Sequence, residues 1–600
     1  MSAATHVVLN QVPPYEDVNL FEADAALRDA VKFNAPSLAT DGLSSLGKVA
    51  GSAGMQRHAR LANLHAPVLH AHDRFGHRID EVEFHPSYHV LLGAALHHRL
   101  HGSPWEAGGP SHVERAAGFM LFTELEPSVL CPVSMTYAVA PALRANAALQ
   151  RAFSGLLASP RYDARFQLAT TKTAMTMGMG MTEKQGGSDV RANTTQAVRD
   201  GADAWGERYR LVGHKWFMSA PMSDAFLVVA QTPAGPTCLF LPRWLPDGSD
   251  GWGRRFRITG HKWFLSAPMC DAFLVLAQSA DGLSCFFMPR VLPDGSINEI
   301  RILRLKDKLG NKANASSEVE FVDALAWRVG DEGRGLPQIL AMGALTRLDC
   351  ALGTAGLMRG AVSLALHHAT HRMAFGKRLV EHALMRNVLA DLALESEAAT
   401  ALALRLARAV DRSEDASTPA AEREHEALMR RLLTPAAKYW VCKRGSHLAQ
   451  EAMECLGGNG YVEEHGEGVM ARIYREMPLN SIWEGAGNIM ALDLLRALRT
   501  GAIADALAHE MRAAKGAHPL LDRAAQRLLV RVENGVDEID ARRLARDLAL
   551  VTQGTLLAQT APAPVLAAFC ESRLDGAPDA FGQLGSSTDF DAILRRAAAH

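Results

Sequence analysis

Two changes of hydrophobic periodicity constrain the fold of this chain more than any other feature. Up to residue 178, Ala-, Leu- and His-rich runs separated by turn clusters such as GLSSLG are typical of helices behind a long irregular arm. From residue 179 to 325, short β-branched and aromatic runs such as FLVVAQ and SCFFMPR alternate with P-D-G and Gly turns, which predicts strands. Beyond that, apolar residues recur at spacings of four and three, as at Ala344, Leu348 and Ala351, and predict long helices.

This order predicts an α+β fold. We expect an N-terminal arm and α domain over 1–178, a β domain over 179–325, a C-terminal helical bundle over 326–500 and an additional helical segment over 501–600. A chain of 600 residues with 48% apolar residues is too long for a single hydrophobic core. A small sheet docked on a helical bundle leaves a groove between unlike domains, where cofactors commonly bind.

Composition excludes several classes of protein. Lys and Arg total 63 and Asp and Glu total 65, which argues against a chain built throughout to hold nucleic acid. The first residues lack the pattern of a secretory signal and no stretch offers about twenty uninterrupted apolar residues, so we expect a cytoplasmic protein without a membrane segment. The eight cysteines form no C-x-x-C pair, and the histidines between His65 and His101 lack partners at metal-binding spacing, so we expect neither disulfides nor a metal site.

The β domain contains a tandem repeat. Residues 209–249 recur as 256–296, offset by 47 residues, with 27 of 41 positions identical. Two units are too few for a stacked repeat array. Because a shift by one whole repeat keeps the inward and outward faces of each strand, two pairings have similar energies. We expect one copy to fill the sheet and the other to protrude or to pair at an edge, where exposed backbone and aromatic side chains favour aggregation.

The segment MTEKQGGSDV at 181–190 carries the first chemical signal. A Thr and a Ser flank a pair of glycines where the chain enters the predicted sheet. Glycines let the backbone approach a planar ligand closely, while hydroxyl and N–H groups meet the polar edge of that ligand. An ordinary turn uses the same residue types, so the pattern alone leaves both interpretations open.

The ten residues together resemble the flavin signature of the acyl-CoA dehydrogenase superfamily, and with Asn-Thr-Thr at 193–195 they resemble its AidB-like branch in particular. The resemblance spans about residues 50–500. It implies the superfamily fold, FAD as cofactor and an acyl-CoA or related small molecule as substrate. It also implies that Met181, Thr182, Gly187 and Ser188 bind FAD, with Thr182 and Ser188 near the ring edge and the pyrophosphate.

The sequence GHKWF-x-S occurs once in each copy of the repeat. In the family this strand carries an aromatic residue and a hydroxyl that lie against the flavin ring, and the matching positions are Phe217 and Ser219 or Phe264 and Ser266. We expect the second copy to occupy the site, because it runs directly into the segment from Arg301 as the family's chain does. The first copy follows the flavin signature equally well, and a buried strand end is the alternative explanation of the pattern.

The sequence NSIWEGAGN at 480–488 opens the last helix of the predicted bundle. A carboxylate at a loop-to-helix transition beside a flavin suits a dehydrogenase, which needs a base to remove the α-proton of a thioester as the β-hydride leaves. By the resemblance, Glu484 is this catalytic residue, while Trp483, Gly485 and Asn488 bind the cofactor. The helix dipole alone also favours a carboxylate at this position.

Two further matches concern FAD held across a subunit boundary. The sequence HRMAFG resembles the family's R-x-x-F-G motif, with Arg372 and Phe375 at the matching positions. The sequence LGGNG resembles a second family motif, with Gly457 and Gly458 at the matching positions. In the family these residues serve the pyrophosphate and the adenosine. The resemblance therefore implies a homo-oligomer, which we expect to be a tetramer.

Several residues depart from the family pattern. Trp483 stands where many members have Tyr, Ala383 and Arg386 replace glutamines, and Glu454 replaces another glutamine. A bulky Trp beside the base narrows the acyl pocket. These substitutions argue against efficient acyl-CoA oxidation.

The AidB-like branch is associated with the response to DNA alkylation, with double-stranded DNA binding and with weak acyl-CoA dehydrogenase activity. A cluster of cations on one predicted helix gives this role a physical basis in Arg430, Arg431, Lys438, Lys443 and Arg444. Contact with phosphates and a solvated face explain the cluster equally well. Two functions therefore stay open: a DNA-binding flavoprotein of the alkylation response with weak dehydrogenase activity, or an efficient dehydrogenase of short or branched acyl-CoA without a DNA role.

Overall fold

The structure is a computed structural model, and it describes residues 5–106, 111–165, 167, 169–189, 192–203, 206–219, 225–232, 235–244, 272–279, 282–291, 300–331, 335–576 and 580–598. The chain forms two compact units, each assembled from separate segments. One unit contains residues 57–110 and 126–346, and we call it the sheet unit. The other contains residues 1–56, 111–125 and 347–600, and we call it the helical unit. The long helix α8 (Gly335–His371) runs from the first unit into the second.

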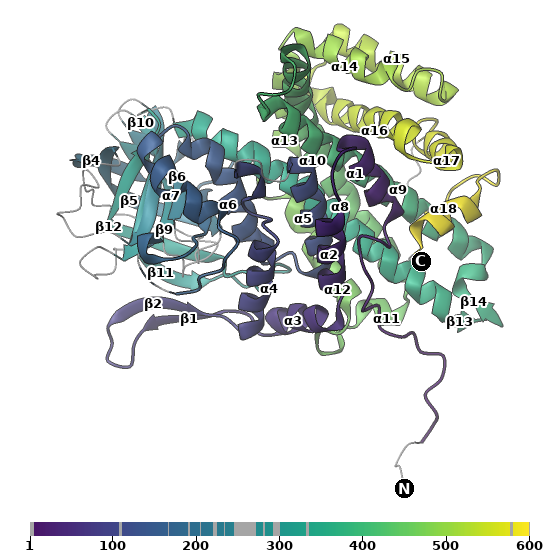
Figure 1. The fold of residues 1–600 in the computed structure, drawn as a ribbon, viewed down its shortest axis with the longest axis horizontal. Coiled ribbons are helices and arrows are strands. Elements are labelled where there is room, and N and C mark those ends of the chain that lie inside the picture. Colours follow the sequence, from purple (N-terminus) through teal and green to yellow (C-terminus); the bar gives the residue numbers. More distant parts are fainter. Residues whose placement is uncertain are drawn as a thin grey trace. The chain divides into compact units, whose positions relative to one another are not determined.

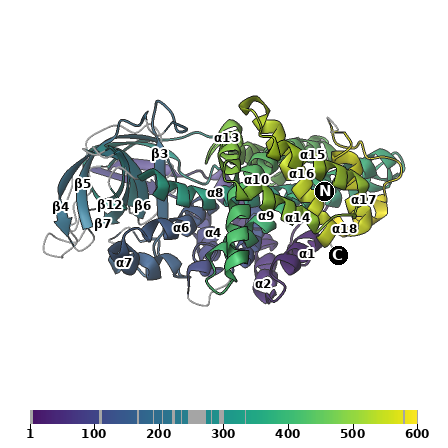
Figure 2. The same ribbon diagram turned by 90° about the horizontal axis from the view of Figure 1, so that it is seen from above.

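In the part of the chain that the structure describes, the sheet unit is built around one nine-stranded sheet, whose strands β4, β5 and β12 are marked in Figure 2. In spatial order its strands are β10 (Gly282–Val291), β7 (Gly235–Trp244), β6 (Ala225–Thr232), β3 (Met177–Thr182), β9 (Ala272–Ser279), β4 (Gln196–Asp203), β5 (Gly206–Ser219), β12 (Ser317–Val329) and β11 (Ile300–Leu305). Helices α4 (Pro86–His97), α6 (Leu130–Leu143) and α7 (Ala147–Ala158) belong to the same unit. The start of β3 is fixed on α6, because the Met177 N–H donates to Thr136 Oγ1 over 2.8 Å.

A short hairpin, β1 (Val68–His72) and β2 (Arg78–Glu83), was not expected from the sequence. It is the two-stranded arm labelled β1 and β2 in Figure 1. Arg78 at the start of β2 donates to the Ile302 carbonyl over 2.7 Å, which fastens the hairpin to the sheet. The strand pattern was missed because strands of five and six residues give too short an alternation for a clear periodic signal.

The helical unit is organised around two long helices, α9 (Ala383–Glu414) and α10 (Ala420–Cys455). These agree with the helices expected from apolar spacing, and the connection rich in Ser, Pro and charges between them is short. The other helices of the unit are α1 (Ala25–Asn34), α2 (Asp41–Ala50), α5 (His112–Leu125), α11 (Gly458–Tyr461), α12 (Val469–Glu476), α13 (Gly487–Leu498), α14 (Ala502–Arg512), α15 (Pro519–Glu533), α16 (Ala541–Thr560), α17 (Ala563–Arg573) and α18 (Phe590–Ala597). Helix α3 (Ala53–Leu64) spans the boundary between the units. The α+β fold class and the extra C-terminal helices are thus confirmed.

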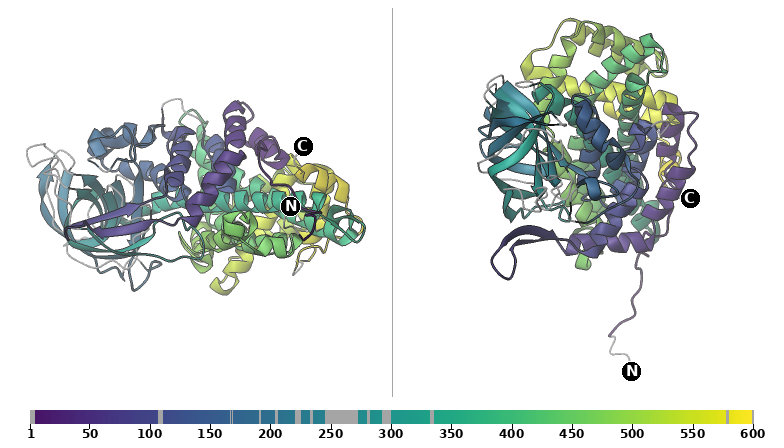
Figure 3. Two further views of the ribbon diagram at one scale, coloured as in Figure 1. Left: turned by 90° about the horizontal axis from the view of Figure 1, so that it is seen from below. Right: turned by 60° about the vertical axis from the view of Figure 1, so that its left-hand side comes forward.

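The C-terminal helices, yellow and light green in Figure 3, are tied to α9 and α10 by buried ion pairs. Arg573 of α17 contacts Asp391 and Glu395 of α9. Arg405 of α9 donates to Glu510 of α14 over 2.6 Å, and burial of that carboxyl is outweighed by hydrogen bonds from His425 and Arg405, which hold the pKa of Glu510 well below its usual range. Buried charges of this kind are costly without a partner, so these pairs specify where the added helices dock.

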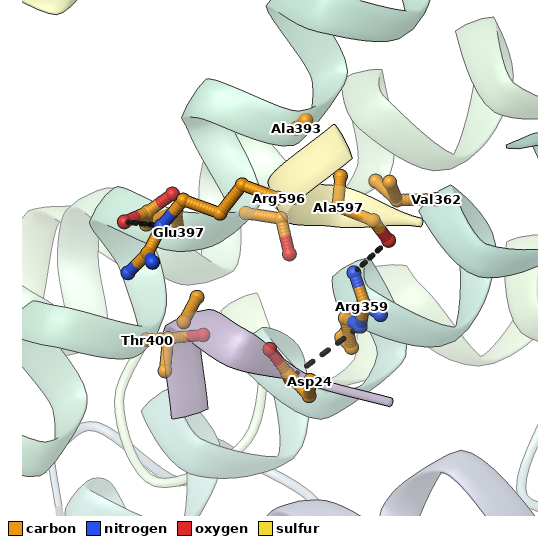
Figure 4. A pocket seen from close by; sticks show the side chains of 10 residues that line it. Asp24, Arg359, Val362, Ala393, Glu397, Thr400, Arg596 and Ala597 are labelled. Atoms are coloured by element: carbon orange, nitrogen blue, oxygen red, sulfur yellow. Dashed lines mark hydrogen bonds and ion pairs between the residues drawn. The ribbon is translucent and has the colours of Figure 1, made fainter. Parts of the chain in front are cut away.

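A small pocket beside α18 shows how the C-terminus is held (Figure 4). Arg359 of α8 donates to the Ala597 carbonyl over 2.9 Å and lies 3.4 Å from the carboxylate of Asp24. Arg596 of α18 donates to Glu397 of α9 over 2.8 Å. The pocket therefore lies among paired charges that fasten α1 and α18 to the bundle.

Three observations complete the description of the fold. Among the described residues, no helix is long and apolar enough to cross a membrane. In the same part of the chain, no group of three or more His, Cys, Asp or Glu side chains is arranged to hold a metal ion. Buried free thiols are found at Cys131, Cys350, Cys442, Cys455 and Cys570.

Both copies of the tandem repeat supply strands to the sheet. Strands β5, β6 and β7 come from the first copy, and β9 and β10 come from the second. Equivalent residues of the two copies share partners: Gly180 of β3 is in register with both Val228 and Val275, and Gly282 is in register with both Thr232 and Ser279. Within each pair, the positions differ by the 47-residue offset of the repeat.

This corrects the expectation that one copy protrudes or pairs only at an edge, because β9 lies within the strand order, between β3 and β4. The physical reason is the identity of the two hairpins. A partner strand that accepts one copy accepts the other in the same register and with the same face inward. The degenerate register inferred from the sequence is therefore visible in the pairing.

A buried ion pair distinguishes the two copies. Lys215 of β5 contacts the Glu183 carboxylate, and both side chains are 0% exposed. Lys262 is the equivalent residue of the second copy and lies outside the described residues. We predict that Lys215→Met lowers the free energy of unfolding by about 3–5 kcal/mol, because it leaves the carboxylate buried without its partner. Lys262→Met should change it by less than about 1 kcal/mol. Denaturant unfolding of the two variants measures both values, and equal losses would contradict the assignment of the first copy to this position.

Candidate active site

The loop that carries MTEKQGGSDV follows β3 in the sheet unit and is fastened to β5. In the register of the two strands, Thr182 lies opposite Phe217 and Met179 lies opposite Ser219. The Lys184 N–H donates to His214 Nε2 over 2.9 Å. The structure thus brings the predicted flavin signature and the F-x-S strand of the first copy together.

This register favours the first copy of the repeat over the second, contrary to our expectation from chain continuity. The second copy does run directly into β11, but β5 of the first copy already pairs with both β3 and β12. Phe264 and Ser266 lie outside the described residues, so their assignment stays a prediction. Continuity along the chain was a weak guide, because β12 reaches β5 by pairing, whatever the length of chain between them.

Glu183 is the organising residue of the loop. Its carboxylate accepts hydrogen bonds from the Thr194 N–H over 2.7 Å and the Thr195 N–H over 3.3 Å, and Lys215 approaches it from β5. Sequence reasoning assigned no role to Glu183 or Lys215, although both lie inside the motifs that it quoted. The signal that could have found them is one acidic and one basic residue in two motifs that border predicted buried strands, where a charge needs a partner.

The loop leaves its polar groups accessible. Met181, Thr182 and Gly187 are half-buried and Ser188 is exposed. A Cβ atom on Gly187 would lie 2.6 Å from Thr182 Oγ1, so only glycine lets the backbone pass the hydroxyl this closely. A threonine hydroxyl held against a bare backbone turn suits a flat polar ligand edge, as the sequence suggested.

Glu484 lies in the helical unit, in the loop between the 3-10 helix η6 (Met477–Ser481) and α13. Its φ is +58°, in the left-handed region that side chains rarely adopt, and Gly485 follows with a φ of +105°. Trp483 is half-buried and donates from its indole Nε1 to Asn480 Oδ1 over 3.0 Å, while Asn488 is exposed in the first turn of α13. The structure therefore places Trp483, Glu484 and Gly485 in one strained turn, with Asn488 directly after it. We call residues 482–488 the base loop.

Cations from two helices contact the base loop. Lys438 of α10 donates from Nζ to the carbonyls of Trp483 and Gly485, over 2.7 and 2.5 Å. Arg347 of α8 donates from Nε to the carbonyl of Glu484 over 3.0 Å. Neither contact is predictable from the sequence, because the partners are backbone atoms that any residue type carries.

These contacts correct part of the predicted DNA-binding cluster. Lys438 is 1% exposed and held inside the unit by the base loop. Arg444 is mostly buried, donates to Glu395 over 3.1 Å and stacks on Phe581. Neither side chain is placed to contact a phosphate. The prediction grouped these residues because they are close together on one helical stretch. Neighbouring positions on a helix inside a bundle point in different directions, so some of them face the interior.

The other members of that cluster are partly accessible. Arg430 pairs with Glu414 over 2.8 Å, and Arg431, with a side chain 42% exposed, pairs with Asp493 over 2.8 Å. Lys443 lies over the Tyr439 ring, and burial together with the neighbouring cation of Arg542 lowers its pKa. Their contact with DNA stays a prediction.

The segment of Arg372 and Phe375 forms a two-strand hairpin, β13 (Met373–Ala374) and β14 (Lys377–Arg378). Phe375 is 96% exposed at the turn, where its φ is +52° and that of Gly376 is +82°. Arg372 donates to the carbonyl of Asn10 in the N-terminal arm. The hairpin therefore presents an aromatic ring to solvent on a conformation that aromatic residues rarely adopt.

Gly457 and Gly458 precede and begin the short helix α11. Both are exposed, and a Cβ atom on either would meet no atom within 4 Å. The φ of Gly457 is +60°, which explains its residue type. The open space in front of the two glycines is compatible with a ligand or a neighbouring subunit.

Three domain families match the chain. Residues 10–164 match the adaptive response protein AidB N-terminal domain, residues 178–248 match the acyl-CoA dehydrogenase middle domain, and residues 333–499 match the acyl-CoA dehydrogenase C-terminal domain. The middle-domain match ends within the first copy of the repeat.

Similar proteins support the same relationship. The chain is 43% identical over 577 residues to the putative acyl-CoA dehydrogenase AidB of Escherichia coli, covering 95% of each chain. It is 29% identical to acyl-CoA dehydrogenase family member 11 of Caenorhabditis elegans, over 73% of this chain and 63% of that protein. The crystal structure of Caenorhabditis elegans ACDH-11 in complex with C11-CoA superposes with a TM-score of 0.77 at 25% identity, over 95% of this chain and 94% of the other. On these matches, together with the flavin-signature loop and the base loop, the chain belongs to the acyl-CoA dehydrogenase family, in its AidB branch.

Proposed function

We propose that the protein binds FAD and oxidises an acyl-CoA thioester with Glu484 as the base. The observation that carries the proposal is the base loop, in which a strained glutamate is held by cations at the start of a helix. FAD, when bound, accepts the hydride that leaves the β-carbon of the thioester. The Glu484 carboxylate removes the α-proton at the same time, so that a carbon–carbon double bond forms.

The residues that would hold FAD follow from the geometry of each unit. In the sheet unit, Met181, Thr182, Gly187 and Ser188 offer hydroxyl and backbone groups beside the β5 positions of Phe217 and Ser219. In the helical unit, Trp483, Gly485 and Asn488 belong to the base loop. Arg372, Phe375, Gly457 and Gly458 are accessible, as expected of residues that serve a cofactor shared with another subunit.

A homo-oligomer is part of this proposal. The ring of Phe375 is 96% exposed on a strained turn, and exposed aromatic side chains are enriched in interfaces. We propose a tetramer in which this hairpin contacts the FAD of a neighbouring subunit.

The role of Glu484 predicts a loss of the reductive reaction. With an acyl-CoA added anaerobically, flavin bleaching should be at least about 100-fold slower in Glu484→Gln than in the parent protein, since the amide cannot accept the α-proton. Stopped-flow absorbance measures the rate, and an unchanged FAD content shows that the site is intact. Bleaching at the parent rate in this variant would exclude Glu484 as the base.

The Gly187 contact predicts a change in FAD affinity. In Gly187→Ala the new Cβ would lie 2.6 Å from Thr182 Oγ1 and must displace that hydroxyl, so the Kd for FAD should rise by roughly tenfold. A matched control is Gly155→Ala in α7, where a Cβ atom meets nothing within 4 Å. Titration of the apoprotein with FAD compares the two. Equal affinities would show that this loop does not contact the cofactor.

A second proposal is duplex DNA binding in the alkylation response, with weak dehydrogenase activity. It is supported by the match to the adaptive response domain and the identity to AidB. On α10, the exposed cation that supports it is Arg431. We expect the affinity for duplex DNA to fall steeply as the salt concentration rises. In Arg431→Ala, the slope of log Kd against log salt concentration should decrease by the contribution of about one phosphate contact. Affinity independent of salt, or absent, would favour the efficient dehydrogenase without a DNA role.

A further inference from the structure

The base loop contains three consecutive backbone carbonyls that accept no hydrogen bond from the backbone of a helix. Residues 482–486 lie between η6 and α13, so the carbonyls of 483, 484 and 485 need other donors. All three accept from cationic side chains: Lys438 serves the first and third, and Arg347 serves the second. The peptide units on both sides of Glu484 are thus held by charges from two different helices.

The conformation of Glu484 requires such support. A glutamate with a φ of +58° is strained, and a strained residue persists only where its surroundings hold it. Gly485 is confined as well, because a Cβ atom there would lie 2.8 Å from Met490 Cε. Release of the carbonyls would let the loop relax and turn the Glu484 side chain away from its present direction.

Arg347 and Lys438 differ in their other partners. Arg347 also donates to Asp493 Oδ2 of α13 over 3.0 Å, so its charge is balanced, and Arg431 donates to the other oxygen of that carboxylate. Within the described residues, Lys438 makes no ion pair, and its hydrogen bonds go to neutral carbonyls. The ammonium of Lys438 is therefore a buried positive charge whose field acts on the base loop.

Among the described residues, three helices supply the titratable and charged groups around the loop. Helix α8 supplies Arg347, Asp349 and Cys350, α10 supplies Lys438, Tyr439, Cys442 and Lys443, and α13 supplies Asp493. Asp349 is paired with Arg115 of α5. Burial raises the pKa of the Cys350 thiol well above its usual value, while Lys438 acts to lower it and Glu484 acts to raise it.

We propose that Lys438 is a positioning residue for the base: it fixes the peptide unit before Glu484 and the peptide unit after Gly485, and it keeps the Glu484 carboxyl ionised at neutral pH. A nearby positive charge favours the carboxylate over the carboxylic acid. A base that must be ionised then stays active to lower pH than it would without the ammonium. This inference rests on the proposed function, in which Glu484 removes the proton.

The test uses the FAD-loaded protein, an acyl-CoA and three variants of one residue. Lys438→Met removes the charge and the donors, Lys438→Gln keeps a donor without the charge, and Lys438→Arg keeps both. We expect the bleaching rate at neutral pH to fall at least tenfold in the Met and Gln variants, while the Kd for acyl-CoA changes less than threefold. The acid limb of the pH–rate profile should move to higher pH in both and return toward the parent profile in the Arg variant.

Control variants distinguish a loss of folding, a failure of the proposed function and a failure of the role proposed for Lys438. Lys48→Met, at an exposed lysine of α2, should leave the rate and the profile unchanged. If the Met variant does not fold, the Gln and Arg variants decide the question. An unshifted acid limb in Lys438→Gln would overturn the role of Lys438 even where Glu484→Gln has lost bleaching. Parent-like bleaching in Glu484→Gln would instead overturn the proposed function, whatever Lys438 does.

Discussion

The pairing of buried charge organises both units of this molecule. In the sheet unit, the Glu183 carboxylate collects two backbone N–H groups and the ammonium of Lys215, and this fixes the loop after β3 on β5. In the helical unit, Lys438 and Arg347 hold the base loop, and Arg405 and Arg573 dock the added C-terminal helices. An ionised group that leaves water must find partners, so each of these contacts specifies geometry as much as it contributes stability.

This principle connects the fold with the proposed chemistry. A base that works at neutral pH needs a defined direction and a defined protonation state, and a loop with a left-handed glutamate provides neither by itself. Cations buried under the loop provide both, since they bind its carbonyls and favour the carboxylate. One of these cations, Lys438, belongs to the cluster that the sequence predicted as a surface for DNA. Its burial places it in the interior of the helical unit instead.

The sequence predicted the order of the elements and the positions of the motifs well. Long apolar stripes predicted α9 and α10, and short β-branched runs predicted the strands, because both signals are local. It also placed Glu484 correctly at the start of a helix. It did not predict the hairpin β1–β2, the pairing of Glu183 with Lys215 or the contacts of Lys438. These depend on which segments meet in space, and a side chain that bonds to backbone carbonyls leaves no pattern in the sequence.

The tandem repeat shows a limit of a different kind. Chain continuity favoured the second copy, yet the register places Phe217 of the first copy opposite Thr182. Two hairpins this similar offer a neighbouring strand the same faces and the same register, so the pattern of residue types does not separate them. Residues outside the repeat distinguish the copies through their contacts, as Glu183 does by pairing with Lys215 of the first copy.

An atomic-resolution crystal structure of the FAD-bound protein tests the central claim most directly. The account predicts a flavin ring in contact with the loop after β3, with the Glu484 carboxylate over it and the Lys438 ammonium still on the carbonyls of Trp483 and Gly485. A flavin bound away from Glu484, or a base loop whose carbonyls have left Lys438, would contradict it.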